Sequence, residues 1–461
     1  MAEEWSSLDL HLPLDRGQGL RSGLEHALRE AVRAGRLAPG TKLPSSRALA
    51  RELGVARGTV TQAYEQLTAE GFLSSTPRSG IAVAEQPGAP VADVLQPFGP
   101  AIPPPKGMDL RPGLPDLSLF PRTEWLAATR HVLQAMPNDD FGYGDPTGHP
   151  ELREALADYL GRARGVVTTA NHVIVTAGYT HALRILCHAL GPSHIAFEDP
   201  SLPEHHALVE GFGLTVSPIP VDDDGLMVEG LTTEAAAIVT PAHQYPLGVT
   251  LSPARRNGLL AWARRTGAVL VEDDYDGEFR YDRQPVGALQ GLAPDDVVYA
   301  GTISKTIAPG LRIAWLVVPT SLVPRLRAVM RWDDAYVGIV DQLALAQLIR
   351  SGGLDRHLRR CRARYRRRRD RLGQAVAEQL PNAHLSGIAA GLHAVLQLPG
   401  DIDEQALITR IISHGVDVAG LSGFYRRPAH ASCGIVIGYA TPPEHTFTNA
   451  LNALMSALRE T

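Results

Sequence analysis

The sequence is poor in cysteine and contains no long apolar run. Its 461 residues include three cysteines, Cys187, Cys361 and Cys433, which lie far apart and lack the spacing of metal ligands. This argues against a disulfide framework or a zinc site and favours a reducing compartment. The sequence also lacks a stretch of about 18 apolar residues that could cross a bilayer.

The N-terminus and the charge balance exclude further classes. The first residues, MAEEWSSLDLHL, are acidic and lack the apolar core of a signal peptide. A net charge of −5 gives no overall bias toward nucleic acid or membranes. Hydrophobic residues make up 44% of the chain and charged residues 20%, as in an ordinary globular protein. We therefore expect a cytoplasmic protein of two or three domains.

A proline-rich stretch marks a domain boundary. Residues 84–108 contain seven prolines, which favour extended polyproline geometry over a packed element. We expect a linker here, between an N-terminal domain of residues 1–83 and a C-terminal domain of residues 109–461.

The N-terminal domain has the pattern of an α+β winged helix-turn-helix. Residues 20–35 form an amphipathic pattern that ends at Gly35, and a second helix follows with Ser45 or Ser46 as its cap. A turn at Gly54 leads to a third helical pattern, and two short β-like runs then flank residues 77–80. Helix, helix, turn, helix and hairpin is the order of a winged helix-turn-helix.

In such a module the second helix of the pair lies in the major groove of DNA, with its N-terminal residues toward bases and phosphates. Arg57 can bind a guanine edge or a phosphate. The small residues Gly58 and Thr59 beside it let the backbone come close to the DNA. Arg47 on the preceding helix could reach a phosphate, and Arg78 on the hairpin could enter the minor groove. The candidate contacts are thus Arg47, Arg57, Gly58, Thr59, Thr61 and Arg78.

Charge alone leaves DNA binding open. Residues 1–84 hold ten Lys and Arg against nine Asp and Glu, a balance of +1, which is short of a strongly basic footprint. A winged helix that binds protein is the alternative. However, LAPGTKLPSSRALARELGVARGTVTQAYEQLTAEGFLSSTPRSG resembles the winged-helix domain of GntR-superfamily repressors over essentially its whole length. The resemblance implies DNA contacts at Arg47, Arg57 and Thr59 and at the wing around Gly80.

The C-terminal domain alternates apolar runs with helical patterns. This alternation predicts an α/β fold with a largely parallel sheet covered by helices. After residue 322 we expect a long Arg-rich helix and a smaller α/β region. The expected strands of the large sheet are residues 172–178, 194–200, 214–221, 235–242, 268–274, 297–302 and 312–318.

A lone lysine, Lys305, lies in a loop of small residues, GTISKTIAPGLRIAW. A Schiff-base lysine on pyridoxal phosphate needs an anion for the pyridine nitrogen, a donor for the ring hydroxyl and a cup for the phosphate. In VLVEDDYDGEF, Asp273 can supply the anion and Tyr275 the donor. The turn Gly178-Tyr179-Thr180 can form the cup at a helix N-terminus. The residues Thr302, Ser304 and Arg312 flank the lysine and add hydroxyls and a positive charge.

Each of these residues also has an ordinary structural explanation. Asp273 could cap a helix, Tyr275 could fill the core, Arg312 could pair with a surface acid, and Lys305 could be a surface lysine. Their joint occurrence at strand ends favours a cofactor site, because open α/β sheets bind ligands there.

The whole arrangement resembles the fold-type I aminotransferases, and more closely the MocR-type regulators, in which a GntR winged helix is fused to an aminotransferase-like domain. The match covers nearly the whole chain, and its carriers are GYGDPTGHPELREAL, TAGYTHAL, TPAHQYPLG, EDDYDGEF and GTISKTIAPGLR. It implies that Lys305 forms the internal aldimine, with Asp273 at the pyridine nitrogen and Tyr275 at the ring hydroxyl. Implied phosphate partners are Tyr179, Thr180, Thr302, Ser304 and Arg312.

The resemblance also concerns two further tyrosines. Tyr245 stands in the place of the Asn of the aminotransferase Asn-Pro-Thr-Gly turn. Tyr143 is implied to reach the phosphate of the neighbouring subunit, because these active sites form at a homodimer interface. A domain-swapped, head-to-tail dimer is one such arrangement.

The departures from the family concern the effector. Amino-acid-binding members hold carboxylates with arginines, but Glu204 and Ser432 stand at those two positions, unless Arg426 or Arg427 substitutes. An amine, a cationic ligand near Glu204 or the cofactor itself is then a better effector than a simple carboxylate. The histidines His205, His206 and His243 lack metal-ligand spacing, and His243 could pack near the cofactor ring.

Residues 355–371 hold ten arginines. Either they form a solvated helix face that bridges two subdomains, or they add a surface that tracks DNA phosphates.

We therefore expect a PLP-dependent transcriptional regulator that binds operator DNA as a homodimer and senses an amine, an amino acid or PLP at Lys305. Any aminotransferase half-reaction would be weak or vestigial. The alternatives are a working aminotransferase with an accessory N-terminal domain and a winged-helix protein whose second domain has lost its cofactor.

Overall fold

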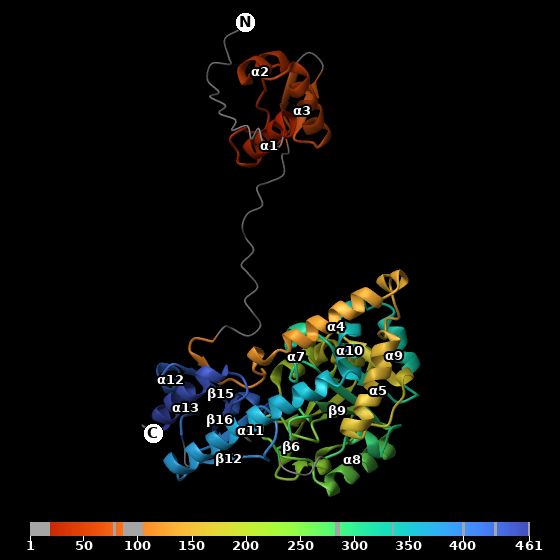
Figure 1. Ribbon diagram of the computed structural model, residues 1–461, viewed down its shortest axis with the longest axis vertical. Coiled ribbons are helices and arrows are strands. Elements are labelled where there is room, and N and C mark those ends of the chain that lie inside the picture. The colour runs from red at the N-terminus through yellow and green to blue at the C-terminus, as the bar shows by residue number, and fades with distance from the viewer. Residues whose placement is uncertain are drawn as a thin grey trace. The chain divides into compact units, whose positions relative to one another are not determined.

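The computed structural model describes residues 19–76, 80–85, 105–281, 286–333, 336–398, 402–427 and 431–459. The chain forms two compact units, Met1–Pro104 and Pro105–Thr461, each with its own helices and strands (Figure 1). The described residues include no helix that is long and apolar enough to span a membrane.

The first unit is the expected winged helix. Helices α1 (Leu20–Arg33), α2 (Ser46–Leu53) and α3 (Arg57–Ala69) precede a hairpin of β1 (Leu73–Thr76) and β2 (Gly80–Val83). The Ser45 hydroxyl accepts a hydrogen bond from Ala48 N and caps α2, so of the two expected caps Ser45 is the one used. The helices and the hairpin bury one apolar core that includes Leu28, Leu49 and Tyr64.

The second unit is built on an eight-stranded sheet whose order is β4-β11-β10-β9-β8-β5-β6-β7. The five central strands from β10 to β6 run parallel, as the apolar runs predict, and β11 is antiparallel to both of its neighbours. The strands are β4 (Val173–Thr176), β5 (His194–Asp199), β6 (Thr215–Asp222), β7 (Gly225–Leu226), β8 (Ala236–Val239), β9 (Val269–Asp274), β10 (Val297–Thr302) and β11 (Ala314–Val317).

Helices cover both faces of this sheet. Successive side chains of β10 point to opposite faces, and both sets are apolar and packed under helices. Val298 and Ala300 pack with α6 (Tyr179–Leu190) and α9 (Val323–Met330) on one face. Val297 and Tyr299 point to the other face, toward residues of α8 (Pro253–Thr266) and α5 (Pro150–Arg164). The remaining helices of the large subdomain are α4 (Arg122–Ala135), α7 (Pro203–Gly211) and α10 (Ile339–Arg350).

The small subdomain has a four-stranded antiparallel sheet, β12-β13-β16-β15, from strands β12 (His384–Ser386), β13 (Ala394–Gln397), β15 (Ala419–Gly420) and β16 (Gly434–Ile437). Helices α12 (Glu404–Ser413) and α13 (Glu444–Arg459) pack with it. The short β3 (Met108–Asp109) pairs with β14 (Val416–Asp417), and Gly107 N donates to Asp417. Residues 107 and 108 therefore make contacts within this unit, and the expected start at 109 stays a prediction.

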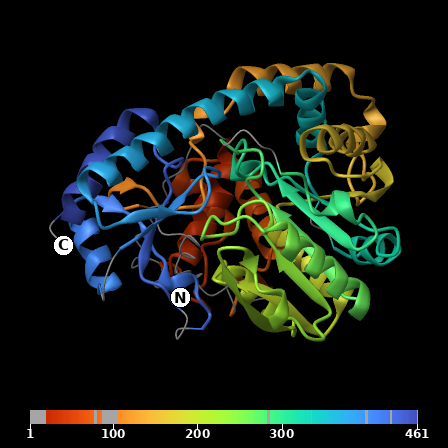
Figure 2. The same ribbon diagram turned by 90° about the horizontal axis from the view of Figure 1, so that it is seen from below.

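The Arg-rich segment lies within α11 (Gly353–Gln379), a long helix that runs from the large to the small subdomain (Figures 1 and 2). Its Arg368 is almost fully buried and binds Asp116, Glu444 and the backbone carbonyls of residues 439, 440 and 442. Arg360 pairs with Glu124, and Arg362 donates to the Glu278 carbonyl. These contacts support the expected bridging role of this helix; its contact with DNA stays a prediction.

Candidate functional site

The lysine loop follows β10 directly. Thr302 ends the strand, and its hydroxyl accepts from Ser304 N and lies 2.9 Å from Ser304 Oγ, which fixes the start of the loop. Lys305 Nζ donates to the Gly113 carbonyl at 2.5 Å. Lys305 is thus half-buried, unlike the surface lysine that was the alternative, and it points toward the chain segment that enters the domain.

Asp273 lies beside this lysine at the carboxyl end of β9. Burial raises the pKa of Asp273 to about 8, and the Tyr179 hydroxyl and Lys305 act in the opposite direction. Burial in turn lowers the pKa of Lys305, while Asp273 and then Asp276 raise it. Desolvation of the amine favours its neutral, nucleophilic form, whereas the neighbouring carboxyl groups favour its protonated form.

The residues expected to form a phosphate cup lie at the N-terminus of α6. Gly178 precedes the helix with φ +90°, and a Cβ on it would come within 2.6 Å of Arg312 Nη2. The Arg312 guanidinium is held across the turn by a 2.9 Å bond to the Ala177 carbonyl. Backbone N–H groups at a helix start, with a cation beside them, fit a phosphate group. The expected cup residues Gly178, Tyr179, Thr180 and Arg312 therefore do meet.

Aromatic side chains pack around Tyr275 and Tyr179. Tyr245 packs edge-on against Tyr275, with ring centroids 5.8 Å apart. Tyr275 Oη donates to the His243 carbonyl at 3.0 Å. The His205 ring lies 4.9 Å from the Tyr179 ring, and burial lowers the pKa of His205 to about 4, so this imidazole is neutral near pH 7.

Other expected residues are placed differently. Tyr143 is fully exposed in the single chain and does not join the group around Lys305. Glu204 is exposed on the first turn of α7, and Ser432 is exposed at a cavity of about 430 Å³ that Tyr425 also lines. The Arg426 side chain pairs with Glu210, and its backbone N–H donates to Asp199. Arg426 is thus already neutralised.

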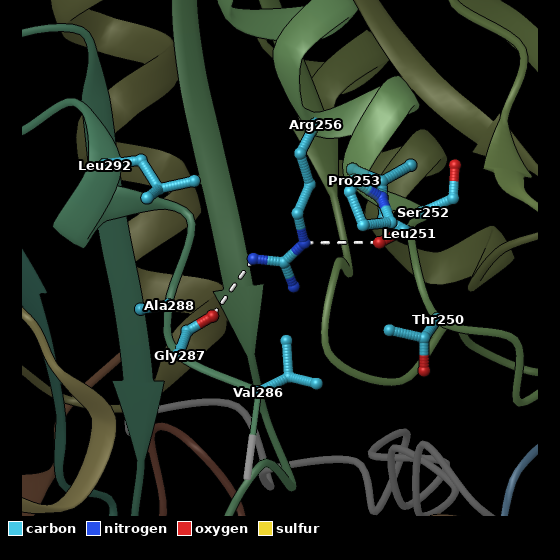
Figure 3. Close-up of a pocket in the computed structure, with 9 residues that line it drawn as sticks. All are labelled: Thr250, Leu251, Ser252, Pro253, Arg256, Val286, Gly287, Ala288 and Leu292. Carbon is cyan, nitrogen blue, oxygen red and sulfur yellow. Dashed lines mark hydrogen bonds between the residues drawn. The ribbon is translucent and has the colours of Figure 1, made fainter. Parts of the chain in front are cut away.

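A second cavity, of about 380 Å³, lies at the start of α8 (Figure 3). Its buried Arg256 donates to the carbonyls of Leu251, Gly287 and Pro241. Every guanidinium nitrogen is therefore bonded to backbone, and Arg256 acts as a clamp between two segments. None of the residues that line this cavity belongs to the group around Lys305.

The candidate DNA interface lies at the start of α3. Arg57 and Gly58 are exposed there, as is Arg47 on α2, while Thr59 and Thr61 are half-buried. Arg57 Nε donates to Ser46 Oγ, which orients the side chain between the two helices. A Cβ on Gly58 would meet no atom within 4 Å, so packing does not demand glycine at this position. Gly80 opens β2 with φ +86°, and Arg78 lies outside the described residues.

Several residues near Lys305 were missed by the sequence analysis. Asp276, His393 and Gly113 come from three separate segments, and each interacts with Lys305 or with a residue beside it. Asp276 lies inside EDDYDGEF and could have been noticed there. No local signal marks His393 or Gly113, because only the tertiary fold brings them to the site.

Two family models match the chain. The model of bacterial regulatory proteins of the gntR family matches residues 20–83. The model of aminotransferase class I and II matches residues 106–454.

Among curated proteins, the chain is 35% identical over 444 residues to the HTH-type pyridoxine biosynthesis transcriptional regulator PdxR of Corynebacterium glutamicum, covering 94% of this chain and 95% of that protein. It is 33% identical over 479 residues to the probable rhizopine catabolism regulatory protein MocR of Rhizobium meliloti, covering 97% and 95%. Among solved structures, an archaeal alanine:glyoxylate aminotransferase matches with a TM-score of 0.71 at 25% identity, covering 77% of this chain and 91% of that one.

Proposed function

This chain belongs to the MocR-type transcriptional regulators, with a GntR DNA-binding domain and an aminotransferase-like domain, and from that membership we propose that it regulates transcription through pyridoxal phosphate bound at Lys305. In this proposal the winged helix binds operator DNA, and the second domain senses an amine-type effector or the cofactor itself. The protein acts in the cytoplasm, where the DNA is.

The observation that carries the proposal is the half-buried Lys305 amine beside the Asp273 carboxyl, with the Gly178–Arg312 cup close by. These residues fit pyridoxal phosphate, because each part of the cofactor has a chemical counterpart. Arg312 and the α6 N-terminus would hold the phosphate, Asp273 the pyridine nitrogen and Tyr275 the ring hydroxyl. Bound there, the cofactor supplies an aldehyde that a primary amine, from Lys305 or from an effector, can occupy.

The charges around the site support an amine effector. Glu204 is close enough to Tyr245 to raise the pKa of that phenol further after burial has raised it. Arg426, the candidate replacement for a carboxylate clamp, is paired with Glu210. The cofactor itself is the other candidate, in agreement with the pyridoxine biosynthesis regulator of Corynebacterium glutamicum to which the chain is similar.

A homodimer completes the proposal. Leu126 and Leu133 on α4, together with Phe141 and Tyr143 in the following segment, expose large apolar side chains on the single chain. Such a patch favours a protein partner, and a second copy would place Tyr143 next to a neighbouring site. Two winged helices would then bind paired half-sites.

Purified protein tests the proposal. It should shift a specific operator fragment, and with pyridoxal phosphate it should develop an absorbance band near the visible edge that Lys305→Ala abolishes. A screen of amines and amino acids should find a compound that changes both the band and the DNA shift. Normal DNA regulation by Lys305→Ala, or the absence of any Lys305-dependent band, would contradict the proposal.

A working aminotransferase is the second candidate, favoured by the likeness to aminotransferase structures. It predicts steady conversion of the bound cofactor to its pyridoxamine form with an amine donor, and its regeneration by a keto acid. We propose that this turnover is weak, because Glu204 and Ser432 stand where carboxylate-binding arginines would be needed.

A further inference from the structure

A buried pair, His243 and Asp276, lies behind Tyr275 and has no role in the function proposed above. His243 follows β8 and Asp276 follows β9, and His243 Nδ1 lies 2.9 Å from Asp276 Oδ2 and 3.1 Å from Tyr275 Oη. Their side chains are 3% and 1% exposed. We infer that His243 and Asp276 are positioning residues that direct the Tyr275 hydroxyl proton toward the cofactor and place a second negative charge beside Lys305. The inference rests on the proposed function.

The direction of the Tyr275 proton follows from the hydrogen bonds. A buried carboxylate needs a donor, and His243 supplies one to Asp276 when Nδ1 carries the proton. A protonated Nδ1 cannot accept from Tyr275. The Tyr275 hydroxyl accordingly donates to the His243 carbonyl, at 3.0 Å. A bound cofactor would offer an anionic ring oxygen, and the Tyr275 hydroxyl would then donate to that oxygen in a stronger, charge-assisted bond in place of the neutral carbonyl.

The charge of Asp276 acts on the lysine. Asp273 and Asp276 both raise the pKa of Lys305 against the effect of burial. Among the described residues, two histidines also face Lys305: His205 on α7 and His393 just before β13. Burial lowers the pKa of His205 to about 4 and that of His393 to about 3, so both are neutral near pH 7. Burial also raises the pKa of Tyr179, Tyr245 and Tyr275, which keeps these phenols protonated.

The small subdomain encloses the pair. Gly391 has φ +72°, and a Cβ on it would lie 2.1 Å from His243 Cε1 and 2.6 Å from Asp276 Oδ2. The His393 ring lies 5.1 Å from the His243 ring. Exclusion of water strengthens the effect of a buried charge. Ligand atoms of His243, Asp276 and His393 also lie within 4.8 Å of one another, so a bound metal ion is the alternative that an experiment must separate.

Four variants of the full-length, cofactor-loaded protein test the inference. Asp276→Asn removes the charge, and His243→Ala removes the donor, so that Asp276 takes up a proton instead. In His243→Asn the amide nitrogen stands where Nδ1 does and can still donate to Asp276. Glu272→Gln is the matched control, because this buried β9 carboxyl bonds to Leu289 N and Gln290 N instead. The readout is the pH midpoint of the Lys305-dependent absorbance, measured with and without EDTA.

We expect the midpoint to fall by about one pH unit or more in Asp276→Asn and His243→Ala, as for loss of a nearby opposite charge. His243→Asn and Glu272→Gln should stay close to the wild type. In the cofactor-free protein, Asp276→Asn should also speed acylation of Lys305 at a fixed pH, followed by mass spectrometry, because less of the amine is protonated.

Two outcomes would overturn the inference. One is an unchanged midpoint and acylation rate in Asp276→Asn and His243→Ala. The other is a shift of the wild-type midpoint by EDTA that equals the shift caused by the substitutions. That result would mean that His243, Asp276 and His393 bind a metal ion. If the wild type has no Lys305-dependent band, the proposed cofactor role fails, and the acylation rate still decides whether Asp276 acts on Lys305.

Discussion

Replacing Gly178 with alanine tests the anion cup most directly. Gly178 has φ +90° and ψ 167°, a conformation that is nearly confined to glycine, so the substitution should cost about 1–3 kcal/mol of stability. The new Cβ would also fall 2.6 Å from Arg312 Nη2 and displace the guanidinium. Loss of a hydrogen bond from this cation to the phosphate, worth about 1.5–3 kcal/mol, should weaken pyridoxal phosphate binding by about 10- to 150-fold.

The same helix offers a matched control. Gly191 ends α6 with φ +69° and ψ −176°, and a Cβ there would meet no atom within 4 Å. Gly191→Ala should therefore lose a similar amount of stability in urea unfolding of the cofactor-free protein, while its affinity for pyridoxal phosphate, measured by absorbance titration, stays at the wild-type value. Arg312→Gln should lose affinity without the backbone strain. Equal cofactor affinity in Gly178→Ala and Gly191→Ala would refute the assignment of the cup.

Three further predictions concern other parts of the chain. Arg57→Ala should weaken operator binding by about 1–3 kcal/mol in a mobility-shift titration, whereas Arg21→Ala, an exposed α1 arginine paired with Glu25, should not. Arg368→Met should cost about 3–5 kcal/mol in urea unfolding, because it removes the nearer of the two cations on the buried Asp116, leaving Arg364 at 3.4 Å, and also removes the donor to the Ala440 and Pro442 carbonyls. The exposed Arg366→Met should cost less than about 1 kcal/mol. Burial raises the pKa of Asp273 to about 8, so between about pH 4 and 8 the folded chain binds more protons than the unfolded chain. The free energy of unfolding of the cofactor-free protein should therefore fall as the pH rises through this range. Asp273→Asn should flatten that slope, and an unchanged slope would contradict the assignment.

The candidate site residues that stand out in the sequence are those that end a local pattern. Asp273 and Tyr275 lie at the end of a run of buried strand residues, and the lone Lys305 follows another such run; their roles stay predictions. The strands of the large sheet were placed within a few residues, since continuous apolar runs are typical of strands buried on both faces. Helices α9 and α10 were not predicted. Helix α10 is apolar almost all round and therefore shows no clear helical periodicity in its sequence.

Contacts between distant segments could not be predicted in this way. Gly113 accepts the Lys305 hydrogen bond from a segment 192 residues away, and Gly391 closes over His243 from the small subdomain. The buried Arg368 was one of ten arginines in a helix, and nothing in its spacing distinguishes it from the exposed Arg366. Whether a charge can be buried depends on which partners the fold brings to it. Here Asp116 and Glu444, from opposite ends of the domain sequence, both pair with Arg368.

The distribution of charge around Lys305 bears on which effector the protein selects. Of the two cations at the site, Arg312 lies in the phosphate cup and Lys305 is the amine that the cofactor's aldehyde would occupy. Carboxyl groups lie around them: Asp273 and Asp276 raise the pKa of Lys305, and Glu204 raises the pKa of Tyr245. A carboxylate entering this space would need a cation that Arg426 cannot offer while it is paired with Glu210. A negative field attracts a protonated amine and repels a free carboxylate, so we propose that the effector is an amine without a carboxylate.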